Sequence, residues 1–173
     1  MRAPKTPFLA ALTGLAAAPA AANAAELSVS VELPRMTVAE YHRPYVALWI
    51  ERPDQAAVKT LAVWYDVKLK NREGTEWLKD MRQWWRRAGR TMTMPADGVS
   101  GPTKAPGRHQ VTFSAAQIGA LPAGSYNLVV EAAREVGGRE VQKVPFSWPP
   151  KAPATTSARG ATELGALSVT VKP

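Results

Sequence analysis

The stretch from Asp97 to His109, D-G-V-S-G-P-T-K-A-P-G-R-H, holds most of the side chains whose spacing could support chemistry. Carboxyl, hydroxyl, imidazole and cationic groups follow one another there within a few positions. Its three glycines and two prolines argue against a helix or a regular strand. We therefore expect an irregular loop, which is either a long turn between two strands or a segment shaped to expose a serine or threonine hydroxyl.

Hydrolysis by a Ser-His-Asp triad would use Ser100, His109 and Asp97. The sequence around the serine, G-V-S-G, is not the G-x-S-x-G elbow, which needs a strand-to-helix turn. Residues held together in one flexible loop are also poorly positioned for catalysis. The two histidines, His42 and His109, have no second ligand at metal-binding spacing. We expect neither a catalytic triad nor a metal site, and no independent enzymatic activity.

The elements that would position this loop are strands. Apolar and polar residues alternate in about seven short segments separated by proline and glycine turns, which is typical of a sandwich. We therefore expect an immunoglobulin-like antiparallel β-sandwich that occupies residues 25–173 as a single domain. The Pro/Ala/Thr-rich segment 149–162 is expected to be a flexible loop before the last strand. The predicted strands cover residues 27–33, 46–50, 61–69, 109–113, 126–132, 141–148 and 167–171.

One segment, Glu76 to Arg87, has the period of an amphipathic helix. Its apolar stripe either closes an open end of the sandwich or offers a tryptophan to a planar ligand. The opposite face carries Lys79, Asp80, Arg82, Gln83, Arg86 and Arg87. Arg82, Arg86, Arg87 and Arg90 form a basic cluster. We interpret this cluster as a solvated face, although it also suits an acidic partner or an anionic headgroup surface.

The N-terminus has the three parts of a secretory signal peptide: a basic start, the apolar run 8–18 and a cleavage site at Ala22-Asn23-Ala24. Cleavage near Ala24 would release residues 25–173 into the periplasm, where nucleic acid is not an expected partner despite the net charge of +8. No second hydrophobic segment follows, so we expect no transmembrane segment in the mature chain. The absence of cysteine excludes disulfides, Cys-ligated zinc, iron–sulfur clusters and covalently attached c-type haem.

Five blocks occur in an order that resembles a known family. They are R-P-Y-V-A-L-W-I-E (43–51), V-K-T-L-A-V-W (58–64), W-L-K-D-M-R-Q-W-W (77–85), D-G-V-S-G-P-T-K-A-P-G (97–107) and P-A-G-S-Y-N-L-V-V-E-A-A-R-E (122–135). Together they resemble the predicted periplasmic proteins of domain-of-unknown-function family 2271. The resemblance implies no established activity. It does imply an extracytoplasmic redox setting, with a membrane-bound PepSY protein and a flavin transferase as partners.

The loop itself has a second resemblance. Asp97, Ser100, Gly101 and Thr103 form D-x-x-S-G-x-T, which is similar to the acceptor sequence of proteins that carry FMN on a threonine through a phosphoester. Pro102 stands where those proteins usually have alanine. This resemblance implies that Thr103 is the attachment point and that Asp97 and Ser100 present it to the transferase.

Two nearby cations, Lys104 and Arg108, could neutralise the phosphoester. Trp64, Trp77, Trp84 and Trp85 are all candidates for the surface that would hold the flavin ring. The sequence thus favours a small electron-transfer or redox accessory protein with covalent FMN. The alternative is a cofactor-free binding domain that docks to a membrane partner.

Overall fold

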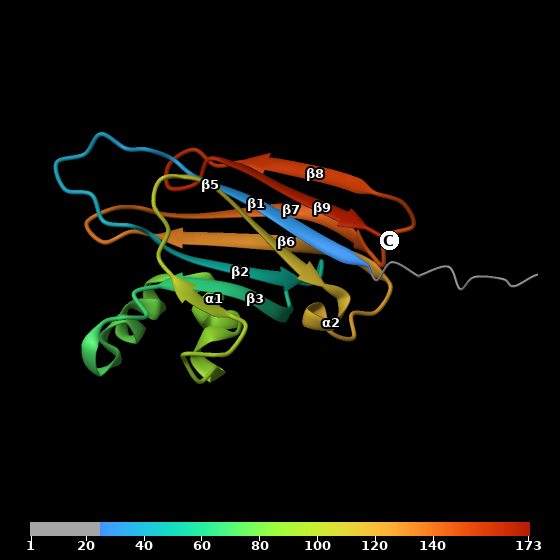
Figure 1. Ribbon diagram of the computed structural model, residues 1–173, viewed down its shortest axis with the longest axis horizontal. Helices are drawn as coiled ribbons and strands as arrows, with labels where there is room; N and C mark the ends of the chain where they lie inside the picture. Colours follow the sequence, from blue (N-terminus) through green and yellow to red (C-terminus); the bar gives the residue numbers. More distant parts are fainter. Residues whose placement is uncertain (1–24) are drawn as a thin grey trace, which may run out of the picture.

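The computed structural model describes residues 25–173, so the predicted signal peptide lies outside the described residues. Two sheets pack face to face (Figure 1), one of four strands in the order β5-β1-β9-β8 and one of five in the order β4-β3-β2-β6-β7. The predicted mainly-β sandwich is confirmed. The strands are β1 (Glu26–Leu33), β2 (Tyr45–Glu51), β3 (Ala57–Tyr65), β4 (Ser100–Pro102), β5 (Gly107–Ser114), β6 (Gly124–Ala133), β7 (Arg139–Trp148), β8 (Ala154–Arg159) and β9 (Ala166–Lys172).

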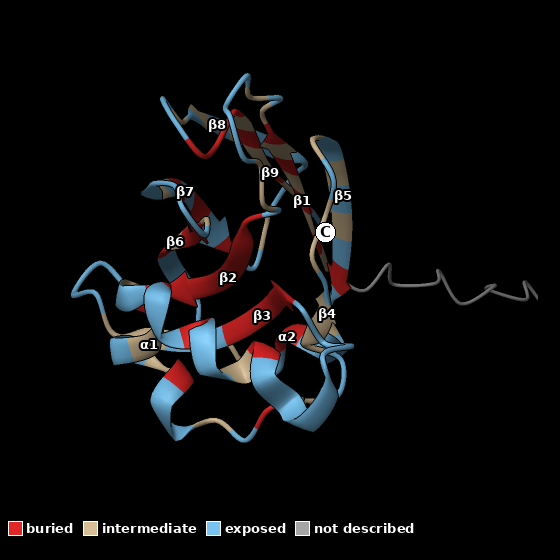
Figure 2. Cartoon of the chain, turned by 90° about the vertical axis from the view of Figure 1, so that its left-hand side faces the viewer, coloured by how far each residue is buried: buried red, intermediate tan, exposed pale blue. Residues whose placement is uncertain are grey.

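A helical layer covers the outer face of the five-stranded sheet, so the molecule has three layers. Strand β2 is buried along its whole length, as Figure 2 shows in red. Its residues Val46, Leu48 and Ile50 face the core between the sheets, whereas Ala47 and Trp49 face the helices. Burying each large apolar side chain contributes about 1.5–3 kcal/mol. Both interfaces of the central sheet are therefore hydrophobic cores.

The helical layer consists of the 3-10 segment η1 (Lys70–Asp80), the helix α1 (Arg82–Arg87) and the turn η2 (Gly89–Thr91). The prediction of one continuous helix over 76–87 was wrong, because the chain breaks at Met81, whose ψ of 70° is not helical. The predicted apolar stripe is nevertheless present in part, since Leu78, Met81 and Trp84 are buried against the sheet. A further short helix, α2 (Ala115–Ile118), follows β5.

A buried carboxylate from the sheet explains where α1 begins. Glu131 on β6 is fully buried, and its two oxygens accept the backbone N–H groups of Gln83 at 3.0 Å and Trp84 at 2.7 Å. These donors belong to the first turn of α1, where backbone N–H groups have no partner within the helix. Arg139 on β7 balances the charge at 2.6 Å. The sheet thereby fixes the helical layer in place.

Segment 149–162 is not the flexible loop that its composition predicted. Residues Ala154–Arg159 form β8, which pairs with β9 along its whole length. The hydroxyls of Thr155 and Thr170 lie 2.9 Å apart across this pair. The strand lacks large apolar residues because it is a sheet edge and only small side chains such as Ala158 pack against the core.

The stretch Asp97–His109 is also more regular than predicted. Ser100–Pro102 form β4, which pairs with β3 in parallel, and β5 already begins at Gly107. Every other strand pair among the described residues is antiparallel. The tight turn before β4 uses Gly98 at a φ of 70°, a conformation that favours glycine. Proline is tolerated in β4 because this strand lies at the edge of its sheet.

Candidate functional site

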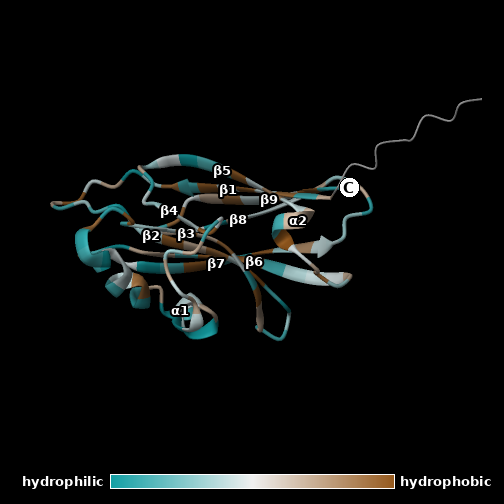
Figure 3. Ribbon diagram, turned by 60° about the horizontal axis from the view of Figure 1, so that its bottom comes forward, coloured by the Kyte–Doolittle hydropathy of each residue, from teal (hydrophilic) through white to brown (hydrophobic). Residues whose placement is uncertain are grey.

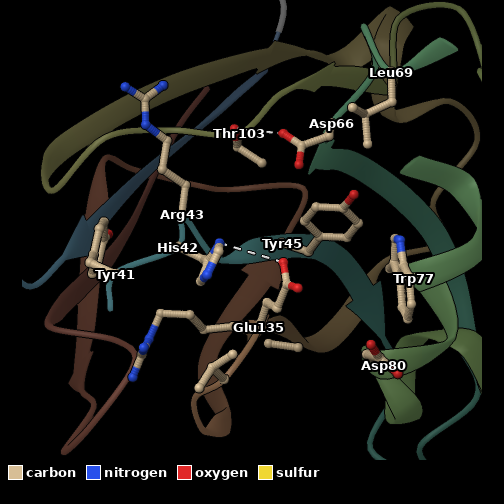
Figure 4. A pocket seen from close by; sticks show the side chains of 13 residues that line it. Tyr41, His42, Arg43, Tyr45, Asp66, Leu69, Trp77, Asp80, Thr103 and Glu135 are labelled. Carbon is tan, nitrogen blue, oxygen red and sulfur yellow. Dashed lines mark hydrogen bonds and ion pairs between the residues drawn. The ribbon is translucent and has the colours of Figure 1, made fainter. Parts of the chain in front are cut away.

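A cavity of about 580 Å³ opens at the end of the five-stranded sheet where β3 ends and β2 begins (Figure 4). Segments from five parts of the chain meet there: the approach to β2, the exit from β3, η1, the residue after β4 and the β6–β7 turn. Its volume is in the range of small-molecule and cofactor sites. It is lined by Tyr41, His42, Arg43, Tyr45, Asp66, Leu69, Trp77, Asp80, Thr103, Ala133, Arg134, Glu135 and Val136.

Thr103 is the residue of the acceptor-like motif that reaches this cavity. Its backbone N–H donates to the carbonyl of Tyr65 at 3.2 Å, which continues the parallel pairing of β4 with β3. Its side-chain hydroxyl donates to Oδ1 of Asp66 at 3.2 Å and is half-buried (Figure 4). The backbone is therefore fixed, while the lone pairs of the hydroxyl oxygen have no protein donor among the described residues.

The other three motif residues do not line the cavity. They lie in the turn before β4 and in β4 itself. Asp97 is exposed in the turn before β4. The hydroxyl of Ser100 accepts the backbone N–H of Ala96 at 2.9 Å and so closes that turn. Gly101 packs against the ring of Trp64, where an added Cβ would lie 3.4 Å from the indole. These three residues therefore belong to the turn and strand that position Thr103 at the cavity.

The two cations expected beside Thr103 are not brought to the cavity. The ammonium of Lys104 lies 5.5 Å from the ring centroid of Trp64, and Arg108 is exposed on β5 opposite Glu32. The arginines that line the cavity are Arg43, which is exposed, and Arg134. Sequence reasoning missed both, because they are far from the motif along the chain.

Of the four tryptophans considered for a planar ligand, Trp77 lines the cavity. Its side chain is 53% exposed, so a ligand could cover it without displacing the core. Trp64 and Trp84 are buried in the two cores, and Trp85 packs partly against the second. Of these four indoles, the one that lines the cavity is therefore that of Trp77.

Tyr45 forms part of the cavity wall and packs edge-on against Tyr65, with 6.1 Å between the ring centroids. Burial raises the pKa of its phenol to about 12. Tyr41 lies against the guanidinium of Arg134 at 5.9 Å, and burial likewise raises the pKa of its phenol. Both rings therefore remain neutral at physiological pH.

Arg134, which lines the cavity, forms a buried ion pair with Glu163. Arg134 donates to both carboxylate oxygens of Glu163, at 2.9 and 3.1 Å, and the N–H of Gly138 donates to the same carboxylate at 2.8 Å.

His42 lies between Glu40 at 2.7 Å and Glu135 at 3.5 Å. No group of three metal-ligating side chains occurs in residues 25–173.

A family model described as "predicted periplasmic protein (DUF2271)" matches residues 26–166, which include every element that lines the cavity. The chain belongs to this family. Membership of the DUF2271 family places the protein in the periplasm, in agreement with the predicted export. Neither a curated protein nor a solved structure gives a significant match. Across residues 25–173, no helix combines the length and the apolar character needed to cross a bilayer.

Proposed function

We propose that this DUF2271 protein is a periplasmic flavoprotein whose FMN is joined to Thr103 through a phosphoester. The observation that carries the proposal is the position of the Thr103 hydroxyl at a cavity of about 580 Å³ lined by aromatic side chains. A transferase needs an acceptor that it can reach, and an attached flavin needs a surface for its ring. The end of the five-stranded sheet offers both within one cavity.

The hydrogen bonding of the Thr103 hydroxyl supports its role as the acceptor of FMN. In the modification the Thr103 oxygen attacks the FMN phosphorus of FAD, so that the O–P bond forms, the diphosphate bond breaks and AMP leaves. The hydroxyl proton passes to a base. Since the hydroxyl points its hydrogen toward Asp66, its lone pairs are directed away from this carboxylate. Asp66 is thus a positioning residue that the motif does not contain.

The side chains that line the cavity suit the ring and the phosphate of FMN. Trp77 and Tyr45 offer the aromatic surface on which an isoalloxazine ring would lie, and Arg43 offers positive charge for a phosphate. The bound flavin would supply the redox chemistry, while the protein supplies the tether, the cavity and its charges. A membrane redox protein, of the PepSY type by the family resemblance, is the proposed electron-transfer partner.

The test is to co-express the full precursor with a flavin transferase and to examine the exported protein on a denaturing gel. We expect flavin fluorescence that resists denaturation in the wild type and in Thr103→Ser, which keeps a hydroxyl. Thr103→Ala should lose the signal. Thr93→Ala is the matched control, because Thr93 is an exposed threonine before the motif. A fluorescent Thr103→Ala protein, or a colourless wild type, would refute the proposal.

A further inference from the structure

A second concave site lies on the helical layer and shares no residue with the Thr103 cavity. It is a groove of about 390 Å³, which we call the basic groove. Four of the five side chains that line it are cationic, and the fifth is an indole. They are Lys79, Arg82, Trp85, Arg86 and Arg139. Figure 3 shows α1 on the outer side of the five-stranded sheet, with hydrophilic, teal segments along the ribbon of the helical layer.

Three of the four cations of the groove have no acidic partner among the described residues. Residues 81–91 contain four arginines and no acidic residue. The fourth cation, Arg139, is paired with the buried carboxylate of Glu131, which also accepts two backbone N–H groups of α1. Lys79, Arg82 and Arg86 form no ion pair with any of residues 25–173. The groove therefore presents a net positive field to solvent.

The arginines are ordered by the helix itself. Nε of Arg86 donates to the carbonyl of Arg82 at 3.2 Å, and Nη2 of Arg90 donates to the carbonyl of Arg86 at 3.3 Å. Each bond uses one of the five N–H donors of a guanidinium and leaves the others free. A planar guanidinium binds phosphate oxygens through two parallel hydrogen bonds. The groove therefore fits oxyanions that accept such paired bonds, which include phosphate and carboxylate.

Two tryptophan side chains lie beside the cations of the basic groove. Trp85 lines the groove, and the ammonium of Lys79 lies 5.9 Å from the ring of Trp77, whose side chain is 53% exposed. Tryptophan is enriched at membrane–water interfaces, and clustered lysines and arginines bind anionic lipid surfaces. The rings enter the headgroup region while the cations bind lipid phosphates. An acidic protein partner would give the exposed indole no comparable environment.

We propose that the basic groove binds the phosphodiester headgroups of anionic phospholipid and holds the protein on a bilayer surface. The five side chains that line the groove are separate from the Thr103 cavity, and Trp77, which lines that cavity, is uncovered in the protein without flavin, so the inference is made for the unmodified protein. Trp77 lies between the two sites, since it lines the cavity and contacts Lys79. Docking through this layer would bring the mouth of the cavity close to the membrane.

The test is flotation of the exported, unmodified protein with vesicles of phosphatidylcholine, with and without phosphatidylglycerol. We expect binding only to the anionic vesicles and a decrease as salt is added. The double variant Arg82→Gln/Arg86→Gln should partition about 30-fold more weakly, since two cations are lost. Lys151→Gln/Arg159→Gln removes the same charge from exposed residues at and near β8 and should partition within about twofold of the wild type.

Three results would overturn the proposal. The first is equal binding to neutral and anionic vesicles, and the second is no binding to either. The third is an equal loss in the two double variants, which would show that total charge and not the groove governs binding. Soluble polyglutamate serves as a competing probe: binding to it without binding to vesicles would assign the groove to an acidic protein partner. Circular dichroism of each variant checks that the fold is unchanged.

Discussion

The hydroxyl oxygen of Thr103 lies 3.2 Å from a carboxylate oxygen of Asp66, although 37 positions separate the two residues in the chain. The parallel pairing of β4 with β3 brings them together, since Thr103 follows β4 directly and Asp66 follows β3. The carbonyl of Tyr65 fixes the Thr103 backbone beside them. One pairing of strands thus sets both the place of the proposed acceptor and the direction of its hydrogen.

Replacing Asp66 with alanine should slow flavin attachment without abolishing it. One hydrogen bond contributes about 1 kcal/mol, so its loss should lower the initial rate about fivefold. Asp66→Asn should recover part of the rate, because its amide oxygen still accepts. The rate is measured as in-gel flavin fluorescence against time with purified transferase. Asp54→Ala, at an exposed aspartate in the β2–β3 turn, is the control; an unchanged rate in Asp66→Ala would remove the positioning role.

Replacing Trp77 with alanine should change the environment of the flavin but not its attachment. An indole in contact with an isoalloxazine quenches its emission, so we expect the fluorescence per bound flavin to rise several-fold. Trp77→Phe should lie closer to the wild type because it keeps an aromatic surface. Intact mass gives the extent of loading separately. Full loading with an unchanged emission yield would show that the ring lies elsewhere, even if Thr103 is the attachment point.

Replacing Glu131 with glutamine should destabilise the fold. Its carboxylate holds the first turn of α1 and pairs with Arg139, and an amide can replace only part of this. We expect the free energy of unfolding to fall by about 2 kcal/mol, as measured by urea denaturation. Glu73→Gln changes an exposed residue of η1 and should have little effect. Equal midpoints for the two variants would contradict the role assigned to Glu131.

Acid should weaken the fold through Glu140. Burial opposes ionisation of this carboxyl, but the backbone N–H groups of Ala161, Leu164 and Thr162 outweigh it and lower the pKa from 4.5 to about 2. A lowered pKa in the folded state gives stability that is present above pH 4.5 and is lost as the pH falls toward 2. Urea midpoints of the wild type should therefore fall over this range.

The matched variant for this pH dependence is Glu140→Gln. It should be less stable than the wild type at pH 7, and the difference should shrink as the pH approaches 2. The carboxylate also accepts the Thr162 hydroxyl at 3.1 Å, so it ties the turn before β9 to β7. A difference that stays constant from pH 7 to pH 2 would show that Glu140 does not contribute through its charge.

The sequence predicted most of the strands in which apolar residues alternate. It failed where the decisive contacts come from elsewhere in the chain. Strand β8 has no large apolar residue and is held by its pairing with β9. The helix predicted over 76–87 is divided because Glu131, far along the chain, takes the N–H groups that would have continued it. Strand β3 ends at Tyr65, although Val67 and Leu69 continue the alternation and are exposed.

The sequence singled out Thr103 in the candidate site and included Trp77 among four candidate indoles. The motif around Thr103 is local, so the spacing of a few residues was enough to single it out. Asp66 had one weak signal, because it is an acidic residue within the predicted strand 61–69, and nothing in the sequence joined it to residue 103. The cavity itself depends on the order of strands in the sheet and on the turn between β6 and β7. Those contacts are long-range and leave no periodic pattern.

The most direct measurement for the central claim is the intact mass of the protein purified from the periplasm of cells that contain a flavin transferase, followed by peptide mapping. The account predicts a mass increase of one FMN minus one water, located on the peptide that contains Thr103. It also predicts that the increase is absent in Thr103→Ala and present in Thr103→Ser. An unmodified mass in the wild type, or a flavin on any other residue, would contradict it.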